Sequence, residues 1–142
     1  MGLDVGDRTI GVAISDALLM TGQGRDTIRR TSIKEDIDQL VNYIVSEGID
    51  RVVVGLPKNM NGTIGPQGEK TIAFQKKLEK KVTYSERTKE MDIEFIMWDE
   101  RPTSIAAHKA MIEGDLSRKK RKQIVDKIAA VYILQGYLDS IR

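Results

Sequence analysis

The chain has 142 residues, of which 40% are hydrophobic and 31% are charged, and it contains no cysteine. This composition predicts one globular domain over residues 1–142, and it excludes disulfides, thiolate metal sites and cysteine nucleophiles. No apolar run is long enough for a membrane span, so we expect a cytoplasmic protein without membrane association. The net charge is only +2, but residues 118–122 are five consecutive cations, a pattern of phosphate-binding surfaces and also of solvated helix starts.

The first thirty residues predict a meander of three strands. Residues 2–6 and 10–15 are apolar runs, and a short turn at residues 6–8 joins them. Residues 24–30 are polar at alternate positions, as expected for a strand near the edge of a sheet.

The middle of the chain predicts a helix, a buried strand and a second helix. Ser32 and Glu35 form a capping box in front of the apolar stripe of residues 32–47. Residues 51–55 contain a β-branched run that is typical of a buried parallel strand. A loop rich in glycine, proline and asparagine then leads to a helix that we expect to start near Pro66 and to run past Leu78, with Phe74 and Leu78 on one face.

The last third of the chain predicts one more strand and two helices. Residues 76–92 are highly charged, and we expect them to form a solvated excursion. Residues 93–98 are predicted to be a strand, residues 103–113 a short helix and residues 117–140 a longer one. A meander followed by βα units predicts an α/β fold with a five-stranded mixed sheet and helices on both faces.

Asp4 is the most informative residue, because a carboxylate inside an apolar strand is costly unless it is paired, protonated or bound to a cation. It lies in the segment GLDVGDRTIGVAIS, near the carboxyl end of the first strand, where α/β sheets commonly place their chemistry. The alternative is a strand-end aspartate that accepts hydrogen bonds from the backbone or from an arginine.

Glu100 also lies at the carboxyl end of a predicted strand. Strand alternation places it on the same face as Trp98 and places Asp99 on the opposite face. A surface ion pair between Asp99 and Arg101 would account for those two residues without any role in catalysis.

Asp126 lies on the long predicted helix, on a face that is otherwise packed. The residues three, four and seven positions later are small or apolar. Lys119 and Lys122 fall on roughly the same face, where they would hold a phosphate backbone while Asp126 binds a metal. The alternative is an exposed Lys122–Asp126 ion pair, worth about 0.3–0.5 kcal/mol.

Three carboxylates that meet without a cation would repel one another and raise the pKa of at least one of them. With Mg²⁺ or Mn²⁺ bound, the same arrangement becomes favourable. Two such ions about 3.5–4 Å apart can stabilise both the attacking water and the leaving oxygen of a phosphodiester. We therefore expect Asp4, Glu100 and Asp126 to be catalytic residues and metal ligands.

Four segments in order resemble the YqgF family of RNase H-like proteins: GLDVGDRTIGVAISD (2–16), VVVGLPKNMNGTIGPQ (52–67), WDERPTS (98–104) and SRKKRKQIVDKIAAVYILQGYL (117–138). Members are described as Holliday-junction resolvases and as nucleases of pre-16S ribosomal RNA. The resemblance covers essentially the whole chain. It implies an RNase H-like three-layer fold, metal-dependent phosphodiester hydrolysis, and metal binding by the three acids already singled out.

The resemblance also indicates where substrate would bind. The family's Gly-Leu-Pro-Lys-Asn loop maps to residues 55–59, and its place after a strand favours substrate contact, with turn chemistry as the alternative. The predicted substrate-binding residues are Arg8, Lys58, Asn61, Lys119 and Lys122.

The expected partner is a structured RNA or a branched DNA, and a resolvase acting on a two-fold junction needs the two active sites that a homodimer supplies. One alternative is a non-catalytic nucleic-acid-binding module of RNase H-like fold, which would keep its affinity after Asp126→Asn. Another is an actin-like ATPase or sugar kinase, because residues 4–15 resemble the first phosphate motif of those enzymes. Those enzymes need two such domains to enclose ATP, so we discount that alternative.

Overall fold

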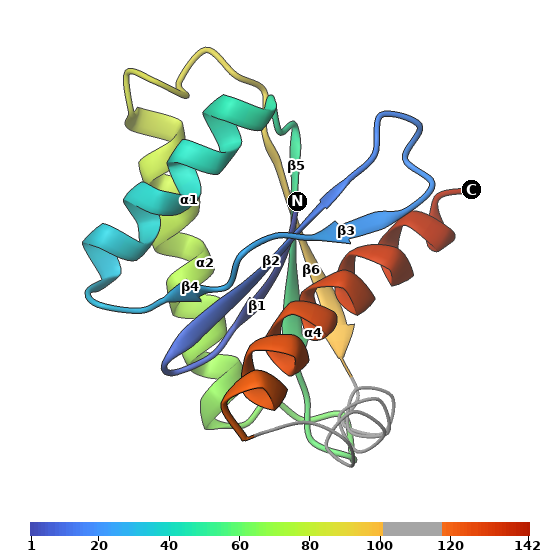
Figure 1. Cartoon of the computed structure of the whole chain (residues 1–142). Coiled ribbons are helices and arrows are strands. Elements are labelled where there is room, and N and C mark those ends of the chain that lie inside the picture. Colours follow the sequence, from blue (N-terminus) through green and yellow to red (C-terminus); the bar gives the residue numbers. More distant parts are fainter. Residues whose placement is uncertain (101–117) are drawn as a thin grey trace.

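The computed structural model describes residues 1–100 and the helix that begins at Arg118, with its side chains described from Lys127 onward. Figure 1 shows the arrangement of the elements. In chain order they are β1 (Gly2–Val5), β2 (Thr9–Ser15), β3 (Gly22–Gly24), β4 (Ile28–Arg29), α1 (Ile33–Glu47), β5 (Arg51–Pro57), α2 (Pro66–Tyr84), β6 (Glu94–Glu100) and α4 (Arg118–Ser140). The predicted helix at residues 103–113 lies outside the described residues.

The sheet has the strand order β3-β2-β1-β5-β6, and β4 also pairs with β2. Strands β1 and β2 are antiparallel, whereas β5 is parallel to both β1 and β6, so the predicted mixed sheet is confirmed. The single strand predicted at residues 24–30 is two short strands, which makes six strands in the described sheet. Glycines at both ends of β3 offer little side-chain packing, and this favours a short edge strand.

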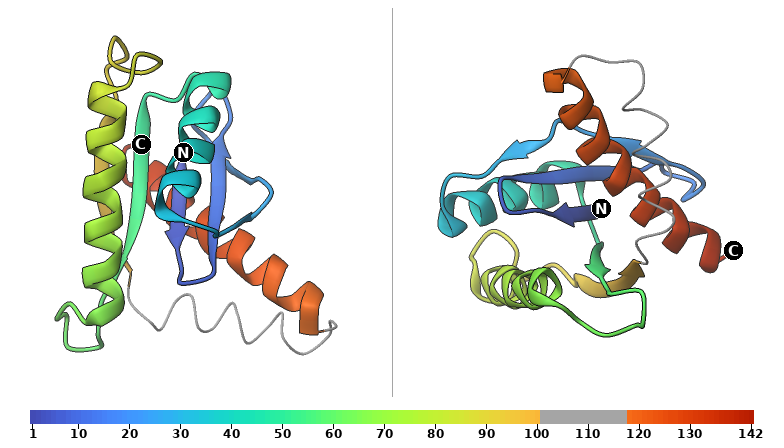
Figure 2. Two further views of the ribbon diagram at one scale, coloured as in Figure 1. Left: turned by 90° about the vertical axis from the view of Figure 1, so that its left-hand side faces the viewer. Right: turned by 90° about the horizontal axis from the view of Figure 1, so that it is seen from below.

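Helices cover both faces of the sheet, as the sequence predicts (Figure 2). Strand alternation divides the core into two parts, and in β5 Val52 and Val54 face α1 and α2 while Val53 faces α4. The larger part, under α1 and α2, includes Leu3, Val5, Ile10, Val12, Leu40, Ile44, Phe74 and Leu78. The smaller part, under α4, includes Ala13, Ala130, Ile133, Leu134 and Leu138.

Helix α1 begins and ends where its capping residues predict. The Ser32 hydroxyl accepts a hydrogen bond from the Glu35 backbone N–H at 3.2 Å, and the Glu35 carboxylate accepts one from the Thr31 hydroxyl at 2.5 Å. Gly48 ends the helix with a φ of 63°, a conformation that glycine adopts without steric cost.

Helix α2 corrects the expectation for residues 76–92. It continues to Tyr84, and Phe74, Leu78 and Val82 are buried at intervals of four residues. In the turn that follows, the buried Thr88 donates its hydroxyl proton to the Val82 carbonyl oxygen at 2.7 Å. The charged side chains occupy the outer side of a packed helix, because one apolar residue per turn is enough to anchor it to the sheet.

Helix α4 matches the prediction for residues 117–140 and lies close against the sheet. A Cβ on Gly2 would stand only 2.7 Å from the Leu134 Cβ, so the helix reaches the sheet because β1 has no side chain there. Among the described residues, no helix combines the length and hydropathy that a membrane crossing requires.

Candidate active site

Asp4 is presented on the α4 face of the sheet. Its neighbours Leu3 and Val5 belong to the core under α1 and α2, so alternation directs Asp4 to the opposite face. The side chain is half-buried, and its strand partner in β2 is Gly11. The predicted carboxylate at the carboxyl end of the first strand therefore faces the helix that carries the third predicted acid.

Glu100 ends β6 and faces the same side. Trp98 packs with the core under α4, and Glu100 follows it by two residues. Asp99 points to the other face, where its carboxylate accepts a hydrogen bond from the Lys58 ammonium at 2.8 Å. The alternation expected for this pair is thus seen, and Asp99 pairs with Lys58, whereas the expected partner Arg101 lies outside the described residues.

Gly55 lies on β5, between the strands that carry the two acids. It pairs with Trp98 of β6. On the other side of β5, the last pair with β1 is Val54 with Leu3, and Asp4 and Gly55 are the next residues of the two strands. A Cβ on Gly55 would stand 2.8 Å from Glu100 Oε2, so the Glu100 carboxylate lies over β5, on the strand next to Asp4. The other oxygen, Oε1, is fully buried. Glu100 therefore lies over a position that has no side chain, on the strand between β6 and β1.

Helix α4 covers this position as well. A Cβ on Gly55 would stand 2.4 Å from Ile133 Cδ1. Asp126 precedes Ile133 by seven residues, which is two helical turns, or about 10.5 Å along the axis on the same side of the helix. The Asp126 side chain, like those of Lys119 and Lys122, lies outside the described residues. The backbone of α4 crosses this face of the sheet obliquely (Figures 1 and 2), and Lys127, the residue after Asp126, lies close to Gly24 of β3.

The two described carboxylates, Asp4 and Glu100, are donors that suit a hard divalent cation. Among the side chains that the structure describes, no cluster of three or more acids or histidines surrounds a single point. Asp4 of β1 and Glu100 of β6 are carboxylates on the same face of the sheet, and oxygen donors of this kind are those that Mg²⁺ and Mn²⁺ prefer.

Three of the predicted substrate-binding residues are described. Arg8 is exposed in the β1–β2 turn. Lys58 is held at the end of β6 by its pair with Asp99 and by a backbone hydrogen bond from its N–H to the Glu100 carbonyl oxygen at 3.0 Å. The Asn61 carboxamide oxygen accepts hydrogen bonds from the N–H and the hydroxyl of Thr63, so Asn61 shapes its own loop.

The sequence places Gly55 at the end of a buried strand and in a loop expected to contact substrate, but it does not associate Gly55 with Glu100. A glycine directly after three β-branched residues of a buried strand is a signal of close approach by another group. That signal does not say which group approaches, and here both Glu100 and Ile133 do.

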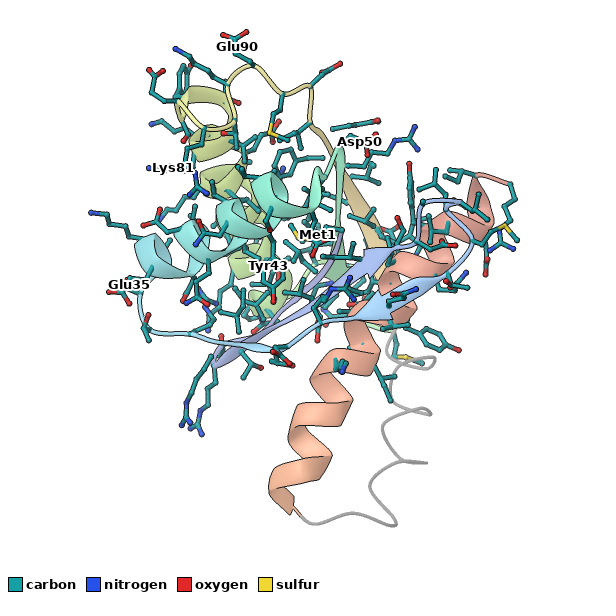
Figure 3. The ribbon with its side chains drawn as sticks, turned by 45° about the horizontal axis from the view of Figure 1, so that its top comes forward. Met1, Glu35, Tyr43, Asp50, Lys81 and Glu90 are labelled. Atoms are coloured by element: carbon teal, nitrogen blue, oxygen red, sulfur yellow. The ribbon has the colours of Figure 1, made fainter. Side chains whose placement is uncertain are left out.

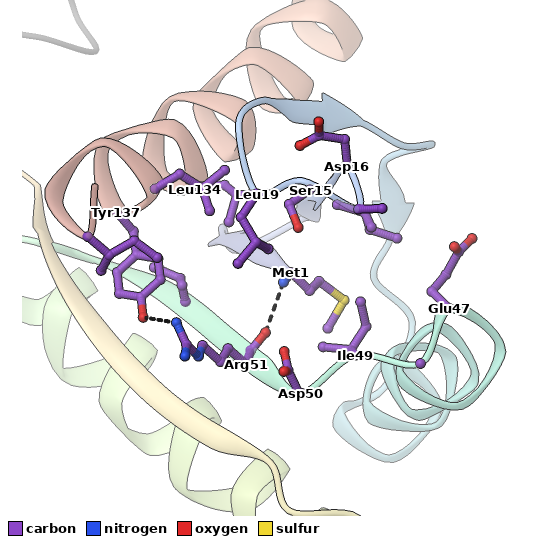
Figure 4. A pocket seen from close by; sticks show the side chains of 16 residues that line it. Met1, Ser15, Asp16, Leu19, Glu47, Ile49, Asp50, Arg51, Leu134 and Tyr137 are labelled. Atoms are coloured by element: carbon purple, nitrogen blue, oxygen red, sulfur yellow. Dashed lines mark hydrogen bonds between the residues drawn. The ribbon is translucent and has the colours of Figure 1, made fainter.

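A separate pocket of about 240 Å³ lies at the opposite end of the sheet, where β5 begins (Figure 4). The Met1 ammonium donates a hydrogen bond to the Arg51 carbonyl oxygen at 2.9 Å, and burial lowers the pKa of this ammonium to about 6. The Arg51 guanidinium donates to the Tyr137 hydroxyl at 3.1 Å. At the rim, the Thr21 and Met20 backbone N–H groups hold the pKa of Asp16 below its usual value.

Neither Asp4 nor Glu100 lines this pocket, so the pocket is distinct from the candidate active site.

Comparisons with known proteins show the family of this chain. A sequence profile of the RuvX family, described as Holliday junction resolvases, matches residues 1–140. A protein of Clostridium tetani (strain Massachusetts / E88) is 60% identical over 141 residues, which are 99% of this chain and 96% of that protein. A protein of Clostridium novyi (strain NT) is 56% identical over 141 residues, which are 99% of this chain and 98% of that protein. Both are named, provisionally, pre-16S rRNA nucleases.

Among solved structures, the chain is similar to T. thermophilus RuvC in complex with a Holliday junction substrate. The likeness covers 98% of this chain and 92% of that chain, with 10% sequence identity and a TM-score of 0.45. It is a distant similarity in both sequence and structure.

Proposed function

This chain belongs to the RuvX family of Holliday junction resolvases, and on that premise we propose that it is a metal-dependent nuclease that hydrolyses phosphodiester bonds in structured nucleic acid. The names of the two clostridial relatives favour the 5′ end of a 16S ribosomal RNA precursor as the substrate, with a Holliday junction as the other candidate. Both substrates are found in the cytoplasm, where a chain without cysteine fits.

The observation that carries this proposal is the position of the Glu100 carboxylate over Gly55 of β5, the strand that pairs with the Asp4 strand β1. We assign Asp4, Glu100 and Asp126 as the catalytic residues and metal ligands. Carboxylates on one face of the sheet, with a third on the helix that covers this face, supply the oxygen ligands that a divalent cation takes. When bound there, Mg²⁺ or Mn²⁺ would supply Lewis-acid stabilisation of the charge that develops on the scissile phosphate.

The chain's own residues would then hold the substrate. We assign this role to Arg8, Lys58, Asn61, Lys119 and Lys122. Lys58 lies at the same end of the sheet as the site, with its ammonium paired to Asp99 on the opposite face, so in the complex this ammonium would be shared between Asp99 and a phosphate oxygen at the end of the sheet. A two-fold junction would require a second copy of the chain, whereas an RNA precursor would require only one.

The experiment that tests the proposal compares Asp4→Asn and Asp126→Asn with the wild-type chain. The panel contains 16S precursor RNA, single-stranded RNA, duplex DNA and a four-way junction, each with Mn²⁺. We expect both variants to lose cleavage, because a neutral amide binds a divalent cation more weakly than a carboxylate does. Thermal melting should show that both variants remain folded.

The matched control is Asp92→Asn, an exposed aspartate outside the site, which should cleave like the wild type. Cleavage retained by both site variants would rule out the assignment. Wild-type binding without any metal-dependent cleavage would support the alternative function, a nucleic-acid-binding module of the same fold.

A further inference from the structure

Helix α2 carries lysines along one side that the proposed active site does not use. Lys70 and Lys77 are seven residues apart and Lys81 follows four residues later, so at 100° per residue all three fall within about 40° around the helix. All three are exposed, and Figure 3 shows Lys81 on the surface of α2. We call these three residues the α2 lysine stripe. It spans about 16.5 Å along the helix axis.

The acids of α2 do not neutralise this stripe. Glu69 and Glu79 lie about 100° and 180° away from Lys70 around the helix, and the Glu79 carboxylate accepts a hydrogen bond from the Gln75 side chain at 2.7 Å. Lys77 and Lys81 make no ion pair with any residue that the structure describes. Their charges therefore face solvent.

The stripe borders an open cleft of about 490 Å³ between α2 and the start of α1. Its lining contains three cations, Arg30, Lys70 and Lys77, against two carboxylates, Asp7 and Asp36. Both carboxylates are occupied, since Asp36 pairs with Arg30 at 2.9 Å and Asp7 with Lys70 at 3.2 Å. The remaining charge of the cleft is positive and comes from Lys77.

The stripe begins at the same end of the sheet as the proposed site. Lys70 contacts Asp7 in the β1–β2 turn, three residues after Asp4. At the same end, the Gln67 side chain donates to the Val5 carbonyl oxygen at 3.1 Å. Asp4, however, faces α4, whereas α2 covers the opposite face of the sheet. A substrate that contacts both the α2 lysine stripe and the proposed site must therefore pass around the end of the sheet.

From this arrangement we propose that the α2 lysine stripe binds the phosphate backbone of a double-helical part of the substrate while a strand of that substrate occupies the site between Asp4 and Glu100. The inference rests on the proposed nuclease function and adds a substrate class to it. A double helix presents two phosphate backbones across each groove, so it can meet cations on both sides of the sheet end. A single strand held at the site on the α4 face would leave the stripe without a partner.

The test uses two double variants of the full chain that differ only in where the charge is lost. Lys77→Gln/Lys81→Gln removes two charges of the stripe. Lys76→Gln/Lys80→Gln removes two exposed charges one residue earlier on the same helix, rotated by about 100°. Affinities for duplex RNA, duplex DNA and single-stranded RNA of one sequence are measured without divalent cations, at two salt concentrations.

We expect the stripe variant to lose duplex affinity and to have a salt slope that is lower by about 1.8, because each phosphate contact contributes about 0.9 to the slope. Its deficit relative to wild type should therefore grow by about tenfold when the salt is diluted fourfold. The control variant should stay close to wild type in both quantities. A loss confined to duplex RNA or to duplex DNA would support the stripe and identify which nucleic acid it binds.

Equal affinities of the two variants for duplex would overturn the inference. An equal loss for single-stranded RNA and for duplex would overturn the assignment to a double helix. Because binding is measured without metal, absence of cleavage by the wild type would contradict the proposed nuclease function and leave this comparison intact. Thermal melting of both variants checks that the exposed substitutions leave the fold unchanged.

Discussion

Gly55 allows the close packing of α4 against the sheet and also leaves room for the Glu100 carboxylate. A Gly55→Ala substitution would place a methyl group 2.4 Å from Ile133 Cδ1 and 2.8 Å from Glu100 Oε2. We expect a loss of about 1–3 kcal/mol in the free energy of unfolding, because overpacking forces side chains out of their rotamers. We also expect cleavage to fall at temperatures where the variant is still folded, since Glu100 must move. Chemical denaturation and single-turnover cleavage measure the two effects.

The control for this substitution is Gly24→Ala. The methyl group at residue 24 would also meet α4, but its nearest neighbours are the side-chain carbons of Lys127, which can swing away. We expect little change in stability or cleavage. An equal loss of cleavage in both variants would show that Gly55 has no special part in placing Glu100.

The contacts of Lys58 could not be predicted from the sequence. The sequence places a cation directly after a buried strand and predicts substrate contact. The structure gives it a carboxylate partner, Asp99, and leaves 21% of its side chain exposed. That partner lies 41 residues away in sequence, on a strand that becomes its neighbour only through the β5–β6 pairing.

At the scale of elements, the start of α1 offers the simplest test of a local prediction. The Ser32 hydroxyl accepts the Glu35 N–H, so Ser32→Ala leaves that donor without its cap. We expect the free energy of unfolding to fall by about 1 kcal/mol. Ser46→Ala in the same helix is the control and should be close to neutral, because Ser46 makes only a 3.5 Å contact with the Tyr43 carbonyl oxygen. Equal effects of the two variants on urea denaturation would refute the cap.

The end of helix α2 differs from the prediction. The sequence predicts a helix from near Pro66 past Leu78 and a solvated excursion over residues 76–92, whereas the helix continues to Tyr84. Its one apolar residue per turn, seen in Leu78 and Val82, is a weak periodic signal beside so many charges. The burial of these apolar residues against the sheet stabilises the helix as far as Tyr84, and that burial depends on the positions of β5 and β6.

At the scale of the whole molecule, the proposed metal site should couple ion binding to folding. The acids come from β1, β6 and α4, so an ion bound by them stabilises only the folded chain. At a concentration of one hundred times its dissociation constant, such an ion would add about 2.7 kcal/mol. We expect Mn²⁺ to raise the melting temperature of the wild type by several degrees, measured by scanning calorimetry.

This stabilisation should be lost in Asp4→Asn and in Glu100→Gln and kept in Asp92→Asn. The readout does not depend on cleavage, so it separates metal binding from substrate choice. A shift of the same size in all four proteins would mean that the ion binds elsewhere.

Three local features can be predicted from the amino-acid order: the caps of α1, the bounds of α4, and the alternation that sends Glu100 and Asp99 to opposite faces. They depend on contacts between near neighbours in the chain, which hydrogen-bonding groups and the helix and strand periods specify. Three other features follow only from the packing of the whole chain: Glu100 lies over Gly55, Lys58 pairs with Asp99, and the α2 lysine stripe begins at Lys70 beside the β1–β2 turn. Those contacts join residues 41 or more positions apart, and the free energy that selects them comes from burying the whole sheet between its helices.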